Sequence, residues 1–304
     1  MRLFDPTPVQ TRPRLTRHLR HEANVTWRML ADNLLACLPP PLTFTLAACF
    51  RAQLPAHQIL WHLGQILLLS LLYAYTFDTS NQARGAEEDR LNKPYRPIPA
   101  GLITSAGAMR RFWIAMPLYT LLGWQLGVVE WVLLWQAAII LINLVSTPRS
   151  YLLCKTPSMV MGTVAQLCGA WQAVSPIDTT VTQWITIITI VYALALLFED
   201  IRDMEGDRAI GRRTPALVLG AWSIRIWFAS LMLITPPLFH FSLYAPTSAA
   251  PWRIAVCDLA LAATCWTSAI RGLLLRHTRA DRVTYQLYMA SYVVALLAGP
   301  VLWF

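Results

Sequence analysis

Nine long apolar runs limit the fold of this chain more than any other feature of its sequence. They lie near residues 29–50, 57–78, 112–128, 130–147, 158–175, 183–199, 214–238, 254–273 and 284–303. A helix needs about 20 apolar residues, and at least about 17, to cross the hydrocarbon core of a bilayer. Charged residues make up only 13% of the 304 residues, too few to cover a soluble surface of this size. The sequence therefore predicts an all-α membrane protein, a bundle of nine transmembrane helices.

The distribution of basic residues supports this number of spans. With nine spans, the N-terminus and the loops after spans two, four, six and eight share one side. That side holds all of the 25 lysines and arginines except Arg51 and Arg253, so it is cytoplasmic by the positive-inside rule. We expect a basic cytoplasmic segment over residues 1–28 and a single transmembrane catalytic domain over residues 29–304. The net charge of +9 fits anionic lipid headgroups better than nucleic acid, and no protein partner is implied.

Acidic residues gather in two short clusters, each at the cytoplasmic end of a predicted span. The clusters contain Glu87, Glu88 and Asp89 after span two, and Glu199, Asp200, Asp203, Glu205 and Asp207 after span six. Charge at a membrane edge is costly unless it is solvated or paired, so this clustering indicates function. If span two continues as a helix, Asn81, Gly85 and Asp89 share one face. Asp200, Asp203 and Asp207 share another, whereas Glu88 and Glu205 are expected to point away and to matter less.

Two facing acidic surfaces could hold Mg²⁺, which binds carboxylate oxygens and shares its coordination shell with substrate phosphates. Basic residues near the clusters are of the kind that a diphosphate needs beyond its metals. Lys93 and Arg96 lie in the three-proline segment 92–101, which cannot be helix interior. Arg212 follows the second cluster, and Lys155 opens the fifth span.

These motifs resemble the UbiA superfamily of intramembrane prenyltransferases, over nearly the whole chain. The family's NxxxDxxxD motif corresponds to Asn81 through Asp89, and its DxxxD motif with a preceding Asp corresponds to Asp200 through Asp207. Tyr151 and Lys155 match a Tyr/Lys pair that the family places near the diphosphate. The resemblance implies the UbiA-type fold and Mg²⁺ held by Asn81, Asp89, Asp200, Asp203 and Asp207. It implies catalytic roles for Asp89, Asp203 and Asp207, and a diphosphate held by Asn81, Lys93, Arg96, Tyr151, Lys155 and Arg212.

One position departs from the family pattern, because the middle Asp of the first motif is Gly85 here. The same NxxxGxxxD departure resembles the membrane-bound terpene cyclases of the superfamily, represented by fungal enzymes that cyclise farnesyl diphosphate. The resemblance implies a magnesium-dependent class I cyclase that converts farnesyl diphosphate to a sesquiterpene hydrocarbon and releases diphosphate. The alternative is a prenyltransferase that moves the prenyl group to an aromatic or other acceptor.

A cyclase would need aromatic rings to stabilise a carbocation, and Trp171, in the fifth span, is a candidate for the cavity. A transporter or lipid-binding protein would explain intramembrane polar residues such as Asn143, but not two acidic clusters at one membrane face. The expected partners are therefore a prenyl diphosphate and the lipid bilayer. We expect a multi-pass membrane protein whose active site opens to the cytoplasm, in the endoplasmic reticulum membrane if the organism is a eukaryote.

Overall fold

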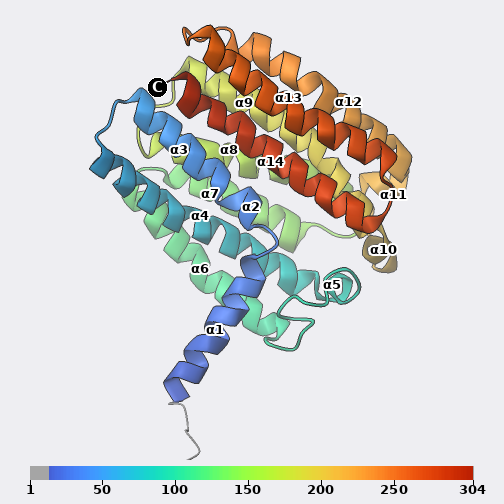
Figure 1. The fold of residues 1–304 in the computed structure, drawn as a ribbon. Coiled ribbons are helices and arrows are strands. Elements are labelled where there is room, and N and C mark those ends of the chain that lie inside the picture. The colour runs from blue at the N-terminus through green and yellow to red at the C-terminus, as the bar shows by residue number, and fades with distance from the viewer. Residues whose placement is uncertain (1–13, 304) are drawn as a thin grey trace, which may run out of the picture.

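The computed structural model describes residues 14–303, and every regular element within them is a helix (Figure 1). The elements are α1 (Arg14–Leu30), α2 (Leu34–Cys37), α3 (Pro39–Arg51), α4 (Ala56–Arg84), α5 (Ala86–Asn92), α6 (Ser105–Gln125), α7 (Val129–Ile139) with a π-helical turn (Ile140–Val145), α8 (Tyr151–Gln172), α9 (Thr179–Ala195) with a 3₁₀ turn (Leu196–Glu199), α10 (Asp200–Ala209), α11 (Pro215–Leu219), α12 (Ala221–Phe239) with a second π-helical turn (His240–Tyr244), α13 (Pro251–Leu274) and α14 (Thr278–Leu302). Residues 1–13 of the predicted basic segment, and Phe304, lie outside the described residues.

The long helices pack in a closed ring. In chain order α3, α4, α6, α7, α8, α9, α12, α13 and α14 each contact the next, and α14 returns to α3 (Figure 1). Helix α8 also packs against α3 across the ring. The larger hydrophobic core contains residues of α3, α8, α9, α12, α13 and α14. A smaller core contains residues of α4, α6, α7 and α8. Because α8 contributes to both cores, it holds the two parts of the ring together.

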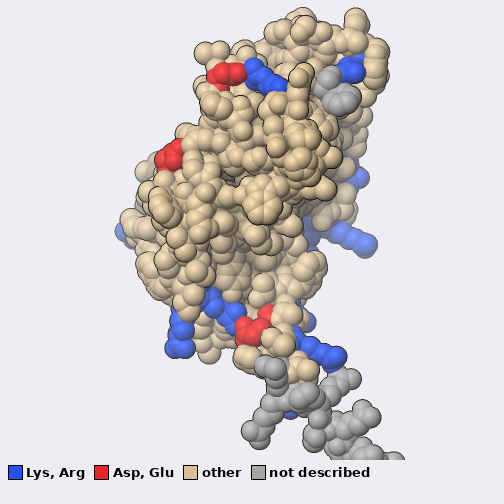
Figure 2. Space-filling view, turned by 90° about the vertical axis from the view of Figure 1, so that its left-hand side faces the viewer, with Lys and Arg blue, Asp and Glu red and all other residues tan. Residues whose placement is uncertain are grey.

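Within residues 14–303, six helical segments are long and apolar enough to cross a membrane: Leu34–Arg51, Ala56–Arg84, Thr179–Ala209, Ala221–Tyr244, Pro251–Leu274 and Thr278–Leu302. Most of the surface that Figure 2 presents is uncharged, as a lipid-facing surface requires. The remaining three predicted spans coincide with α6, with α7 and its π-helical turn, and with α8. The all-helical multi-pass architecture is therefore confirmed, whereas the number of nine spans stays a prediction.

Two predicted spans are interrupted near their N-terminal ends. In the first, α1 ends at Leu30 and α3 begins at Pro39, and the first turn of a helix is where proline fits best. In the seventh, Gly220 separates α11 from α12 with φ of 84°, a backbone conformation that residues with a side chain rarely adopt. Local backbone chemistry, rather than hydropathy, decides where these helices begin.

The segments that carry the two acidic clusters, α5 and α10, pack against each other at one end of the ring. Gly206 allows this approach, because a Cβ atom there would lie 2.3 Å from Nδ2 of Asn92 in α5. The same Asn92 amide donates a hydrogen bond to the backbone oxygen of Asp203, 3.4 Å away. The fold therefore brings together two clusters that are more than 100 residues apart in the chain.

Candidate active site

A cavity of about 410 Å³ opens where α5 and α10 meet. All of the predicted site residues line it: Asn81, Asp89, Lys93, Arg96, Tyr151, Lys155, Asp200, Asp203, Asp207 and Arg212. The π-helical turn after α7 also reaches the wall, a position typical of functional sites. The structure thus confirms that these residues are neighbours, while the role of each stays a prediction.

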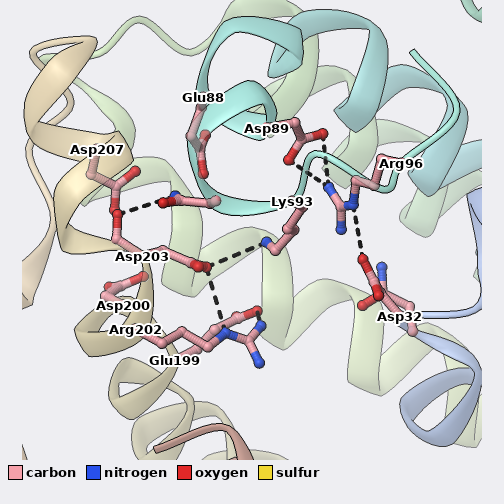
Figure 3. A network of polar contacts seen from close by, with 12 residues as sticks. Asp32, Glu88, Asp89, Lys93, Arg96, Glu199, Asp200, Arg202, Asp203 and Asp207 are labelled. Carbon is pink, nitrogen blue, oxygen red and sulfur yellow. Dashed lines mark hydrogen bonds and ion pairs between the residues drawn. The ribbon is translucent and has the colours of Figure 1, made fainter. Parts of the chain in front are cut away.

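On the α5 side, Asp89 is paired with Arg96 from the proline-rich loop (Figure 3). Nη1 of Arg96 lies 3.0 Å from both carboxylate oxygens of Asp89, and its Nε donates to Asp32, 2.9 Å away. Asp89 is only 2% exposed. Burial raises the pKa of Asp89 above its ordinary value, and the Arg96 guanidinium opposes that effect. The loop is non-helical, as its prolines predicted, and it carries Arg96 into the acidic site.

On the α10 side, Asp203 is held by two basic side chains. Nζ of Lys93 lies 3.4 Å from Oδ2 of Asp203, and Nε of Arg202 lies 3.6 Å from the same oxygen. Arg202 also contacts Glu199, with 2.6 Å between Nη2 and Oε1 (Figure 3). Its guanidinium stacks over the ring of Tyr285, 4.3 Å from the centroid. Asp203 therefore lies between a lysine from the α5 side and an arginine of its own helix.

Asp200, in the first turn of α10, has one carboxylate oxygen with a partner and one without. Its Oδ1 accepts a hydrogen bond from Nζ of Lys155, which also lies 3.5 Å from Glu199. Its Oδ2 is buried and has no hydrogen-bond partner in the described structure. An unpaired buried carboxylate oxygen is costly, so a donor or a cation from a ligand would stabilise this residue.

Arg212 also connects the two acidic clusters. Its Nη1 lies 2.5 Å from Oε2 of Glu88 and 2.9 Å from Oδ1 of Asp207, and its guanidinium lies over the ring of Tyr151. The expectation that Glu88 points away from the site is wrong, because Glu88 is buried and lines the cavity. Seven residues separate it from Asn81, nearly two turns of helix, so both lie on one face. Glu205, by contrast, is exposed.

The residues around the cavity fit Mg²⁺ in their chemistry. Carboxylate oxygens are the ligands that a hard divalent cation takes, and the free Oδ2 of Asp200 shows capacity for another partner. Among the described residues, no three acidic, histidine or cysteine side chains gather closely enough to form a metal site by themselves. The acids are instead paired with lysines and arginines, which a diphosphate would attract.

Below the charged rim, aromatic side chains form part of the cavity lining. Trp135 stacks on Tyr73 with 4.4 Å between ring centroids, and Tyr192 and Tyr292 approach to 4.9 Å on the opposite wall. Trp171, the tryptophan singled out from the sequence, is not part of this wall. It packs against Phe44 and Trp303, because it follows Tyr151 by 20 residues, about 30 Å along α8.

Sequence reasoning missed several polar residues of the rim. Asp32 accepts hydrogen bonds from both Arg96 and Tyr95, and burial together with Asp32 raises the pKa of Tyr95 to about 12. Asn33 donates to the fully buried Asp78 of α4. The available signal was an Asp-Asn pair at the edge of the first apolar run, where polar groups need partners.

A sequence model of the UbiA prenyltransferase family matches residues 41–294. The somaliensene A/B synthase of Streptomyces somaliensis is 35% identical, over 95% of this chain and 96% of that protein. The diterpene cyclase eriG of Hericium erinaceus is 39% identical, over 51% of each chain.

Among solved structures, a UbiA homolog from Archaeoglobus fulgidus bound to GPP and Mg²⁺ has the same fold. It superposes with a TM-score of 0.63 at 13% identity, over 90% of this chain and 98% of that one. The shared fold thus extends over most of the helical ring.

Proposed function

The chain belongs to the UbiA prenyltransferase family, and from this premise we propose that it is a magnesium-dependent membrane-bound terpene cyclase. The substrate is a prenyl diphosphate, and we propose farnesyl diphosphate, cyclised to a sesquiterpene hydrocarbon with release of diphosphate. The coarser assignment, an enzyme of a family whose members act on prenyl diphosphates, follows from family membership. The choice of cyclisation rests on Gly85 and on the shape of the cavity.

The charged rim is suited to the first step, in which the bond between C1 of the prenyl chain and oxygen breaks. The electron pair leaves with the diphosphate, so negative charge grows where Lys93, Arg96, Lys155 and Arg212 lie. Preorganised cations at the point of developing charge lower such a barrier by several kcal/mol, typically about 2.7–4 kcal/mol per donor. When bound, Mg²⁺ would neutralise the diphosphate oxygens; we propose Asp89, Asp203 and Asp207 as its main ligands, with Asn81 and Asp200 assisting.

The interior of the cavity is suited to the second step. The allylic cation left behind can react with double bonds of its own chain if water and other nucleophiles are excluded. Aromatic faces such as those of Trp135 and Tyr73 stabilise positive charge during this cascade. Loss of a proton ends it and gives a neutral hydrocarbon.

Gly85 is the observation that favours cyclisation over transfer to an acceptor. It lines the cavity next to Asn81, and nothing but a hydrogen projects from it. With Gly85 the motif reads NxxxGxxxD, the pattern that resembles the membrane-bound terpene cyclases, instead of the NxxxDxxxD of the prenyltransferases. Both relatives described above carry the names of terpene-forming enzymes, which supports the same choice.

We further propose that the ring of helices crosses the membrane nine times, with residues 29–304 as one domain. The cavity then opens at the cytoplasmic face, at the end where the basic residues gather, in the endoplasmic reticulum membrane if the organism is a eukaryote.

The experiment that tests the proposal supplies membranes containing the enzyme with farnesyl diphosphate and Mg²⁺ alone. A cyclic hydrocarbon should form without any co-substrate, and EDTA should abolish it. Geranyl and geranylgeranyl diphosphates run in parallel, because one relative is named a diterpene cyclase. If product forms only when an aromatic acceptor is added, and carries that acceptor covalently, the enzyme is a prenyltransferase.

A further inference from the structure

Position 85 lacks a carboxylate of its own, but the carboxylate of another residue lies beside it. A Cβ atom built on Gly85 would lie 3.8 Å from Oε2 of Glu88 and 3.1 Å from the backbone oxygen of Asn81. The φ of Gly85 is −90°, which any residue can adopt. The backbone therefore does not demand glycine here, and the neighbouring side chain has to be considered instead.

Glu88 is placed to cover position 85 by ordinary helix geometry. The two residues are three apart, so they share a face. Side chains on a helix lean toward its N-terminus and cover the turn before their own Cα atom. A glutamate at position 88 also reaches one methylene further than an aspartate would. Its Oε2 thus lies 3.8 Å from the point where an aspartate side chain at position 85 would begin.

The surroundings of Glu88 are those of a functional carboxylate. It is 8% exposed and lines the cavity. Arg212 forms ion pairs with both Glu88 and Asp207, so one acidic residue from each cluster contacts the same guanidinium group. In Figure 3 Glu88 descends from α5 on the side of Asp207, whereas Asp89 turns toward Arg96. The neighbouring Asp200 has its buried Oδ2 without a partner, which independently indicates that this wall accepts a ligand.

We propose that Glu88 is a metal ligand that replaces the carboxylate absent at position 85. It would act together with Asp207 across the cavity, while the Arg212 guanidinium that they now share turns to the diphosphate. This inference rests on the proposed magnesium-dependent function and adds a residue to its site. It explains why a chain with Gly85 retains two acidic clusters that both face the cavity.

The proposal also predicts how positions 85 and 88 depend on each other. An aspartate at position 85 would project toward Glu88, because Oε2 of Glu88 lies 3.8 Å from the Cβ position of residue 85. Its carboxylate would therefore reach the metal that Glu88 is proposed to hold. Gly85→Asp combined with Glu88→Gln should recover binding, because one carboxylate is then restored.

The test measures metal binding rather than turnover. Mn²⁺, whose free form is measured by electron paramagnetic resonance, is titrated into purified full-length enzyme in detergent with inorganic pyrophosphate. Glu88→Gln should weaken Mn²⁺ binding at least about tenfold, the loss seen even for outer-shell partners of metals. Glu87→Gln is the matched control, since Glu87 is the adjacent glutamate but is exposed and outside the cavity, and it should bind like the wild type.

A second pair of variants tests whether Glu88 binds the metal itself or only keeps Arg212 in position through their ion pair. In an Arg212→Gln background, Glu88→Gln should still weaken Mn²⁺ binding by the same factor. If Glu88→Gln has no effect in the Arg212→Gln background, Glu88 is not a metal ligand. The same conclusion follows if the single variant Glu88→Gln binds Mn²⁺ as tightly as the wild type. Thermal unfolding of each variant shows that it is folded, and failure of the double variant at positions 85 and 88 to recover binding also contradicts the proposal.

The proposed function fails in a different way. Wild-type enzyme that binds no Mn²⁺ with pyrophosphate and forms no product from any prenyl diphosphate would contradict the cyclase itself. If the wild type binds Mn²⁺ and Glu88→Gln binds it equally well, the proposed cyclase function is unaffected. Only the assignment of Glu88 to the metal site is then wrong.

Discussion

The acids that face the cavity each have a basic partner from another part of the chain or from their own helix. Asp89 has Arg96, Asp200 has Lys155, Asp203 has Lys93 and Asp207 has Arg212. Removing one member of a buried ion pair leaves an uncompensated charge, at a cost of about 3–5 kcal/mol. These residues therefore affect both the stability of the cavity and its chemistry, and a variant has to be judged on both.

Replacement of Asp203 by Ala should lower turnover of the prenyl diphosphate by about 10²–10³-fold, because the site loses a proposed ligand of the Mg²⁺ that would neutralise the diphosphate. The same result is expected for Asp89→Ala and Asp207→Ala. Glu205→Ala is the control, since Glu205 belongs to the same cluster but is exposed. Product is measured from equal amounts of folded enzyme, and equal effects of Asp203→Ala and Glu205→Ala would remove Asp203 from the site.

Replacement of Asp32 by Asn should weaken substrate binding by disturbing Arg96. Asp32 accepts from Nε of Arg96 and from Tyr95, and a hydrogen bond to a charged group contributes about 1.5–3 kcal/mol. The KM for the prenyl diphosphate should rise about tenfold or more. Asp178→Asn is the control, because Asp178 pairs with Arg51 away from the cavity. If Asp178→Asn raises the KM as much as Asp32→Asn does, Asp32 acts only through overall stability.

Among the helices, the approach of α5 to α10 is the arrangement most sensitive to a small change. Gly206→Ala places a methyl group where the amide of Asn92 now lies, so the two acidic segments have to separate. Turnover should fall about tenfold or more, since a misplacement of 1 Å can cost about a hundredfold. Gly64→Ala is the control, because a Cβ atom at that position meets nothing within 4 Å.

A compensating substitution shows whether the effect of Gly206→Ala arises from this contact. Gly206→Ala combined with Asn92→Ala removes the amide that obstructs the methyl group, so part of the activity should return. A double variant as inactive as Gly206→Ala alone would place the cause elsewhere in α10.

The helices themselves could be predicted from the sequence because apolar runs and prolines are local signals. The continuation of the second span as one helix through Asp89 is interrupted at Gly85, where α4 ends and α5 begins, although Gly85 and Asp89 each donate a backbone hydrogen bond to the residue four positions earlier. The contact between α5 and α10 was predicted only as two acidic faces that meet. That Gly206 makes room for Asn92 could not be read from the sequence, because the contact depends on tertiary packing.

The side of each helix that faces the cavity was harder to predict than the helix itself. Glu88 was misassigned although its spacing from Asn81 is helical. Trp171 was misassigned because distance along α8, rather than residue type, excludes it from the aromatic wall. Trp135, which does line that wall, lies in an apolar run whose polar neighbour, Gln136, donates a hydrogen bond to Met116 of α6, so the polar residue there does not mark the cavity face.

For the molecule as a whole, the main prediction is its orientation in the membrane. With nine spans the N-terminus is cytoplasmic and Phe304 is on the other side. Tags at the two ends should differ in accessibility to protease in sealed vesicles. Asn24, in the Asn-Val-Thr sequon of α1, is exposed, and in the predicted orientation, with the N-terminus in the cytoplasm, it should stay unglycosylated in a eukaryotic host. Two tags protected on the same side would require an even number of spans.

The ion pairs of the rim can form only late in the synthesis of the protein, because their partners lie far apart in the chain. Lys93 finds Asp203, and Glu88 finds Arg212, only after more than 100 further residues have been made. Lys155 finds Asp200 after 45 more. A ribosome adds about 5–20 residues per second, so the first half of the protein spends several seconds in the membrane with these charges unmatched. Cellular quality control therefore has a definite signal for an unfinished chain, and versions that stop before α10 should be degraded soon after insertion.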